Sequence, residues 1–238
     1  MSDHVLLNAE AHRDLRIRRE RSAELGDGVM TAMTVPNEFR RVQADYPILF
    51  RRNHERGDVV ALAMFGFESG ENLFLQDDRW DARYLPLSMD IQPFLIGGAP
   101  ESEGDKQVVI DLASPRIAEG EGVRLFDQDG RPTPYLDTIV ERLGVLDAGY
   151  QESRGFFAAL VRYDLLEPFT LDVTLDDGAA HRMVGFHIID EDKLRGLDAA
   201  TLGDLNREGH LLPLFMAVAS LANLPALIAR KNRQVASG

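Results

Sequence analysis

The first half of the chain alternates between apolar and polar positions at the spacing of β-strands. Leu15 and Ile17 share one face of a short extended segment, and arginines occupy the other face. Apolar runs at 29–35, 47–52 and 59–67 lie between turn signals, with a short helix beginning at Pro36 after the first run. Runs at 84–97 and 106–113 continue the pattern, and Pro86 and Pro93 predict an edge or bulged strand for the first of them. The pattern predicts a mostly antiparallel β-sheet in the N-terminal part.

From about Thr133 the spacing becomes helical. Pro134 suits a first helical turn, and a helix over 135–146 and a second over 155–166 are expected on either side of the polar stretch 147–154. Residues 169–175 and 180–190 then predict a β-hairpin, after which Asp190 and Asp198 are expected to cap short helices.

Strands that precede helices, with one late hairpin, predict an α+β fold with helices inserted in the sheet and a helical C-terminus. The chain shows no internal repeat. We therefore expect a single domain over residues 1–238, with the loop-like segment 97–105 as the place where two lobes would divide.

The closing segment, Leu211 to Ala229, contains no charged residue and approaches the length of a membrane span. Pro213, Asn223 and Pro225 interrupt it, so a helix buried in the protein or against a second copy is expected rather than a span. The helical spacing predicts an apolar stripe that includes Leu214 and Phe215 and a second face of small residues that includes Ala217 and Ser220. A homodimer through this helix is one of the two arrangements left open.

The net charge and the composition limit the classes of partner and of chemistry that fit this protein. A net charge of −13 and a pI near 4.9 argue against nucleic acid or an anionic membrane. The absence of cysteine excludes disulfides, thiolate metal sites and cysteine nucleophiles. The N-terminal residues lack the apolar core of a signal peptide, so a cytoplasmic protein is expected. No phosphate-binding loop or nucleophile-elbow motif occurs, and we expect no cofactor.

Two histidines are the candidates for a metal site. His181 and His187 are six residues apart, so both would lie on one face of a regular strand. No third ligand is evident nearby, and half-exposed strand histidines without a metal are the favoured interpretation. A cluster of arginines near the N-terminus is interpreted as a solvated strand face, because acidic residues are interleaved with it. The cluster consists of Arg13, Arg16, Arg18, Arg19 and Arg21.

The stretch GFESGENLFLQDDRW contains the only tryptophan of the chain. Gly66 and Gly70 allow a left-handed turn or a close backbone approach, and Asn72 can fix that turn through its side chain. Trp80, followed by Tyr84 and Phe94, would supply a large amphipathic surface. Asn72, Trp80, Tyr84 and Phe94 are therefore the candidate ligand- or partner-binding residues, although a core position for Trp80 is the favoured alternative.

In their order, several short motifs resemble the bacterial SapC-like family from His12 to about Leu224. They include HRDLRI, VPNEF, YPILF, GENLFL followed by a Trp and YLPL, PFLIG, LFDQDGRPT, LLEPFTL, GFHIIDEDKL and LNREGHLLPL. The chain departs from the family at Ile91 and Gln92, where arginines are typical, so an anion-binding role is not transferred. The resemblance supplies no catalytic residues. The peptide-transporter permease that shares the name needs several spans and does not fit this sequence.

The resemblance implies an accessory or substrate-handling protein, since relatives are encoded beside flavin-dependent halogenase-like proteins and outer-membrane receptors. We expect a soluble, non-catalytic protein that binds a peptide, a small ligand or a protein partner. The alternative is a metal-dependent enzyme of oxidative metabolism that uses His181 and His187. A third hypothesis, a surface-layer-associated protein, rests on the family name alone.

Overall fold

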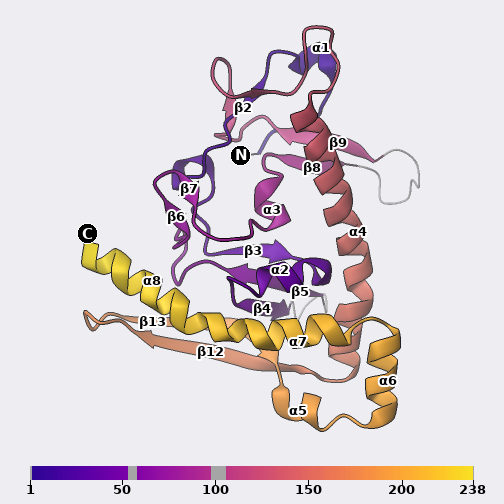
Figure 1. Cartoon of the computed structure of the whole chain (residues 1–238), viewed down its shortest axis with the longest axis vertical. Helices are drawn as coiled ribbons and strands as arrows, with labels where there is room; N and C mark the ends of the chain where they lie inside the picture. The colour runs from indigo at the N-terminus through magenta and orange to yellow at the C-terminus, as the bar shows by residue number, and fades with distance from the viewer. Residues whose placement is uncertain (1, 53–57, 98–105, 238) are drawn as a thin grey trace. The chain divides into compact units, whose positions relative to one another are not determined.

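The computed structural model describes residues 2–52, 58–97 and 106–237, and it confirms the α+β class with antiparallel sheets and a helical C-terminus. The chain forms two compact units (Figure 1). Unit 1 comprises Met1–Gly28, Leu75–Trp80 and Leu87–Ala148, and unit 2 comprises Val29–Phe74, Asp81–Pro86 and Gly149–Gly238. Most of the expected lobe boundary, 97–105, lies outside the described residues.

Unit 1 contains short strands around a helix. Its elements are β1 (His4–Leu6), α1 (Ala9–His12), β2 (Arg16–Ile17), η1 (Ala23–Leu25), β6 (Leu75–Gln76), β7 (Arg79–Trp80), α3 (Leu87–Asp90), β8 (Phe94–Gly97), β9 (Gln107–Asp111), β10 (Ile117–Ala118), β11 (Val123–Arg124) and the first half of α4 (Pro134–Arg162). The strands form antiparallel sheets in the orders β1-β9-β8, β10-β2-β11 and β6-β7. Leu136, Ile139 and Leu143 of α4 pack in the core with Phe94 and Ile110, since their spacing of three and four residues puts them on one helix face.

The single strand expected over 84–97 is wrong. A helical turn, α3, precedes β8, and Leu87 and Met89 of this turn are buried. The carbonyl of Leu87 accepts the amide of Ile91 at 3.0 Å, so the turn satisfies its own backbone. An apolar run between two prolines does not distinguish a strand from a buried helical turn by its pattern alone.

A buried ion pair lies in unit 1. Arg116 and Asp27 are 1% and 0% exposed, and Nη2 of Arg116 donates to Oδ2 of Asp27 at 2.5 Å. Nη1 of Arg116 also donates to the carbonyls of Arg18 and Glu20. Arg21 pairs with Asp27 at 3.3 Å and is largely buried, so it does not belong to the solvated arginine face expected from the sequence. Burial lowers the pKa of Arg21, and the nearby Arg116 lowers it further.

Unit 2 is built on a five-stranded antiparallel sheet in the order β12-β13-β4-β5-β3. Its elements are β3 (Thr31–Thr34), η2 (Pro36–Glu38), α2 (Phe39–Val42), β4 (Ile48–Arg52), β5 (Val59–Met64), the second half of α4, β12 (Leu166–Thr174), β13 (Ala180–Ile189), α5 (Glu191–Arg195), α6 (Ala199–Arg207), α7 (Leu211–Ser220), η3 (Leu221–Asn223) and α8 (Leu224–Ser237). Asp190 and Asp198 accept backbone N–H bonds as the expected caps of α5 and α6.

The two helices expected on either side of 147–154 form one helix of 29 residues. The polar stretch continues the helix because it contains no proline and leaves most of its polar side chains in solvent. Gly149 suits this position, since a Cβ there would lie 2.8 Å from Cγ2 of Val35. The hydroxyl of Ser153 donates to the carbonyl of Tyr150 within the helix. The prediction of two helices is wrong, because a solvated helix surface and a loop share the same polar pattern.

A bulge in β13 changes the faces of the two histidines. Phe169 of β12 pairs with Phe186, whereas Leu171 pairs with Met183, so β13 has one extra residue between these pairs. Gly185, with a φ of +83°, lies at this point. Met183 and Phe186 consequently share a face, and His181 and His187 lie on opposite faces. The shared face expected for the two histidines is wrong.

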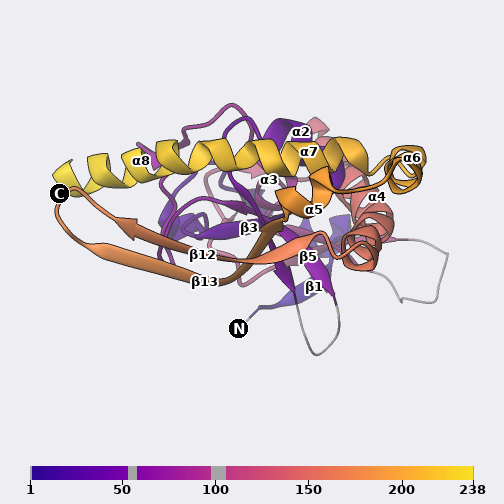
Figure 2. The same ribbon diagram turned by 90° about the horizontal axis from the view of Figure 1, so that it is seen from below.

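The segments α7, η3 and α8 continue one another along one face of the sheet that contains β12 and β13 (Figures 1 and 2). The buried positions of α7 are Pro213, Leu214, Ala217 and Ser220, whereas Phe215 is half exposed. Phe215 of the expected apolar stripe is therefore exposed, and Ala217 and Ser220 of the expected small face are buried instead. Small side chains allow close approach, and the Ser220 hydroxyl accepts the amide of Ile48 in β4 at 2.8 Å.

Candidate functional site

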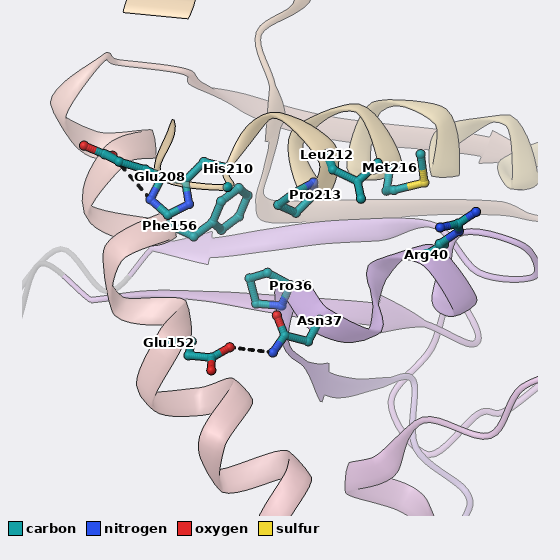
Figure 3. A pocket seen from close by; sticks show the side chains of 11 residues that line it. Pro36, Asn37, Arg40, Glu152, Phe156, Glu208, His210, Leu212, Pro213 and Met216 are labelled. Carbon is teal, nitrogen blue, oxygen red and sulfur yellow. Dashed lines mark hydrogen bonds and ion pairs between the residues drawn. The ribbon is translucent and has the colours of Figure 1, made fainter. Parts of the chain in front are cut away.

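A pocket of about 550 Å³ opens in unit 2 where α4, α7 and the η2–α2 turn come together (Figure 3). Each wall comes from a different part of the sequence. The lining residues are Pro36, Asn37, Arg40, Glu152, Phe156, Glu208, Gly209, His210, Leu212, Pro213 and Met216. Such a concave space with a few convergent polar groups is the usual form of a small-ligand site.

The apolar wall follows α7. Leu212, Pro213 and Met216 project from its first turns, and Phe156 of α4 lies beside His210 (Figure 3). Phe156 and Pro213 are buried, but Leu212 is 55% exposed. Pro213 is compatible with this position because the first turn of a helix leaves its amides without helical partners. The wall presents an apolar surface that a ligand side chain can cover.

His210 and Glu208 form the polar group at one end of the pocket. Nε2 of His210 lies 3.4 Å from Oε2 of Glu208, and the imidazole contacts Phe156 edge to face with 5.7 Å between ring centroids. Burial lowers the pKa of His210, Glu208 opposes this shift, and Arg162 adds to it. The lowered pKa favours the neutral imidazole, in which one nitrogen donates and the other accepts a hydrogen bond.

Glu208 is oriented by a second contact, because Nη2 of Arg162 donates to both of its carboxylate oxygens at 3.2 and 3.0 Å. Gly209, with a φ of +75°, turns the chain between Glu208 and His210 after α6 ends. The left-handed turn favours glycine and lets two neighbouring polar residues point into one site.

The lower wall holds a second acid. The amide of Asn37 donates to Oε2 of Glu152 at 2.7 Å, which links η2 to α4 (Figure 3). Arg40 of α2 lines the other end, away from His210 in this view. Arg40 is exposed, and none of the ion pairs between the described residues involves its guanidinium. The pocket thus combines two paired carboxylates, a neutral imidazole and one arginine available to an anionic group.

Among the described residues, none that lines the pocket carries a hydroxyl or thiol nucleophile. Within residues 2–52, 58–97 and 106–237, no three His, Asp or Glu side chains gather closely enough to hold a metal ion. A neutral histidine with a carboxylate can bind a ligand through hydrogen bonds. The arrangement is suited to recognition by an apolar wall and polar ends.

None of the four residues singled out from the sequence lines this pocket. In unit 1, Trp80 is half-buried in β7 opposite Leu75, and Phe94 is a core residue 2% exposed. The position of Phe94 in the core is explained by its edge-to-face contact with Tyr135 and its pairing with Ile110.

Asn72 and Tyr84 lie in unit 2. The side-chain oxygen of Asn72 accepts the amide of Phe74 at 3.0 Å, which is the turn-fixing contact expected from the sequence. The Tyr84 hydroxyl donates to Oε1 of the buried Glu38 at 2.6 Å, and the guanidinium of Arg41 lies 4.7 Å from its ring centroid. Both residues therefore stabilise local structure.

The two candidate metal ligands have separate surroundings. Nδ1 of His181 lies 3.1 Å from Oε1 of Glu68, and its ring packs beside Phe67. His187 pairs across the sheet with Phe50 and with Pro168. Because the bulge places the two imidazoles on opposite faces, they do not form a common site.

Sequence reasoning missed the pocket residues, although the signal was in the motifs. Pro36 and Asn37 come from VPNEF, and Glu208, His210 and Pro213 come from LNREGHLLPL. These motifs are far apart in the chain, and each is too short to indicate a site alone. The fold brings the two together across α4.

The sequence matches the model of a known protein family. The model of the SapC family matches residues 7–227, nearly the whole chain. No curated protein and no solved structure matches the sequence.

Proposed function

Because the chain belongs to the SapC family, we propose that it is a non-catalytic accessory protein that holds a peptide or small ligand in the pocket formed by α2, α4 and α7. The observation that carries the proposal is the pocket itself. Two separate family-like motifs supply its polar and apolar walls, and the lining includes the exposed Arg40, which has no ion-pair partner among the described residues.

The chemistry of the walls favours a ligand with a carboxylate and an apolar group. Arg40 would bind the carboxylate, because a guanidinium donates two parallel hydrogen bonds to that group. Leu212 and Met216 would cover the apolar part, and His210 would donate to or accept from a polar group at the other end. A peptide C-terminus with an apolar last residue has these features.

The wider role remains part of the same proposal. The family resemblance supports an accessory function beside a flavin-dependent halogenase-like or outer-membrane uptake system. The metal-dependent enzyme is the weaker alternative, since its two histidines lie on opposite faces of β13. The surface-layer role is supported by the family name only.

The proposal is tested by titrating the full chain with N-acetylleucine and with N-acetylleucine amide, and by following the Met216 methyl and His210 ring signals by NMR. The acid is expected to shift both signals and the amide to bind more weakly. Arg40→Glu should weaken binding of the acid about tenfold or more, which corresponds to about 1.4 kcal/mol. The amide should be affected much less.

The matched control is Arg131→Glu, which makes the same charge change at an exposed arginine of unit 1. It should leave the binding of both probes unchanged. An equal loss of affinity for the acid in both variants would show a general charge effect. Failure of the acid and of longer leucine-terminated peptides to shift either pocket signal would contradict the proposed site.

A further inference from the structure

The two ring nitrogens of His210 have different surroundings in the pocket of unit 2. Nε2 lies 3.4 Å from Oε2 of Glu208. It also faces α4, because a Cβ at Gly155 would lie 3.6 Å from both Nε2 and Cε1. The edge-to-face contact with Phe156 packs the ring in this orientation. One nitrogen is therefore turned toward an acid and a helix, and the other is not.

The second nitrogen, Nδ1, takes part in no hydrogen bond between the described residues. His210 is the N-cap residue of α7, yet its side chain makes no capping bond to the amides that follow. The buried polar atoms that lack a hydrogen bond in the described ranges do not include Nδ1, so this atom reaches the solvent. Because His210 lines the pocket, Nδ1 is available to a ligand there.

Glu208 decides which nitrogen carries the proton of the neutral ring. Its carboxylate accepts hydrogen bonds only, and Arg162 donates to both of its oxygens. A proton on Nε2 points toward this carboxylate, whereas a proton on Nδ1 would leave a lone pair of Nε2 facing a negative charge. Burial lowers the pKa of His210, which favours the neutral ring. The arrangement thus favours the proton on Nε2 and leaves Nδ1 as an acceptor.

The position of His210 depends on the contacts that hold α7 on the sheet of unit 2. The segment Leu211–Ala236 is long and apolar enough to cross a membrane by length and composition. In the structure, however, the Ser220 hydroxyl accepts the amide of Ile48 in β4, and Arg230 pairs with Asp81 at 2.7 Å. These contacts keep the first turn of α7 in place, so that His210 stays beside α4.

The ligand groups that meet Arg40 and His210 belong to different residues of a bound peptide. Arg40 lines the end of the pocket away from His210 (Figure 3). Each residue of an extended peptide spans about 3.3–3.6 Å, so the N–H of the last residue lies close to its own carboxylate. With that carboxylate on Arg40, the N–H of the preceding residue extends further toward His210.

We infer that His210 is a specificity-determining residue of the pocket, whose Nδ1 accepts the N–H of the residue before the last in a bound peptide. The inference rests on the proposed function and adds a requirement to it, since the ligand must present a donor at this end. Glu208 is a positioning residue, because it acts on the ligand only through the proton of His210.

Two probes that differ in one group test the inference with the full chain at pH 8, above the ordinary histidine pKa of about 6.5. They are acetylglycylleucine and acetoxyacetylleucine, in which an ester oxygen replaces the glycine N–H. Both keep the carboxylate and the leucine side chain, and the Met216 methyl signal reports their binding by NMR. The peptide should bind about tenfold more tightly, because the ester presents an acceptor to Nδ1.

His210→Leu removes the acceptor and should bind the two probes equally. Circular dichroism checks that this variant is folded. A tenfold preference that persists in His210→Leu would assign the N–H to another acceptor and overturn the inference.

The proton is located directly by long-range ¹H–¹⁵N NMR of the His210 ring in the ligand-free parent protein, which needs no variant. It should reside on Nε2. Glu208→Gln should lower the fraction of this tautomer and reduce the preference for the peptide, because the charge that faces Nε2 is lost. The matched control is Glu141→Gln, which removes an exposed acid elsewhere on α4 and should change neither result.

The outcomes separate this inference from the proposed function. A proton on Nδ1 would overturn the inference, and so would equal affinity for two probes that both shift Met216; the pocket would stand in either case. If neither probe shifts Met216, the proposed ligand site is wrong and the inference fails with it.

Discussion

Lys231 of α8 donates a hydrogen bond to Oε1 of Glu71, 2.5 Å away, in the glycine-rich loop that follows β5. The other oxygen of Glu71 accepts the amide of Phe67 at 2.8 Å. Glu68 lies 3.7 Å from the same ammonium and 3.1 Å from His181. Burial lowers the pKa of Lys231, but Glu71 and Glu68 outweigh it, and the pKa is raised overall. This cluster connects α8, β13 and the loop.

Replacing Lys231 with methionine should destabilise the protein by about 3 kcal/mol, because the buried Glu71 carboxylate loses its counter-charge. Urea unfolding measures the change. The double variant Lys231→Met with Glu71→Gln should recover part of the loss, since it removes both charges. A single variant as stable as the parent would show that the pair contributes nothing to α8 docking.

Gly66→Ala should cost about 1–3 kcal/mol, since an overpacked site must shift its neighbours. A Cβ at Gly66 would lie 2.9 Å from the carbonyl oxygen of Glu71 and 2.8 Å from its Oε2. Gly144→Ala, in α4 with open space around it, is the matched control and should stabilise by about 0.5–1 kcal/mol. Melting curves of both variants test whether Gly66→Ala lowers the stability and Gly144→Ala raises it.

His210 should make stability fall in mild acid. Its pKa in the folded protein is lowered, so the unfolded chain binds the proton more strongly. The contribution is complete above about pH 6.5, the ordinary histidine value, and is lost as the pH falls through the folded pKa. NMR titration of the ring gives the folded value directly. His210→Gln should flatten this part of the stability profile, and an unchanged profile would contradict the assignment.

Arg116→Met should destabilise unit 1 by about 3–5 kcal/mol, because it leaves the fully buried Asp27 without its closest ion-pair partner. Arg116→Lys should fail to restore the parent stability, since an ammonium lacks the fork that reaches Asp27 and two carbonyls together. Arg131→Met, at an exposed arginine, should change stability by less than about 0.5 kcal/mol. Denaturant unfolding compares the three.

The sequence by itself determined the α+β class, the late hairpin, the caps at Asp190 and Asp198 and the turn chemistry around Gly70 and Asn72. These features depend on neighbouring residues. Alternation sets a strand face, a side-chain oxygen caps the amides next to it, and a glycine permits a positive φ. The motif order also indicated the family that matches residues 7–227.

Only the tertiary structure decided which apolar face of α7 is buried, where the β13 bulge falls and which residues meet in the pocket. One extra residue in β13 reverses the face of every later side chain, and periodicity does not reveal it. An apolar helix can bury either side, and β4 selects the small one through Ser220. Pro36 and His210 become neighbours in one pocket because α4 and the sheet bring distant segments together, and no local pattern records that contact.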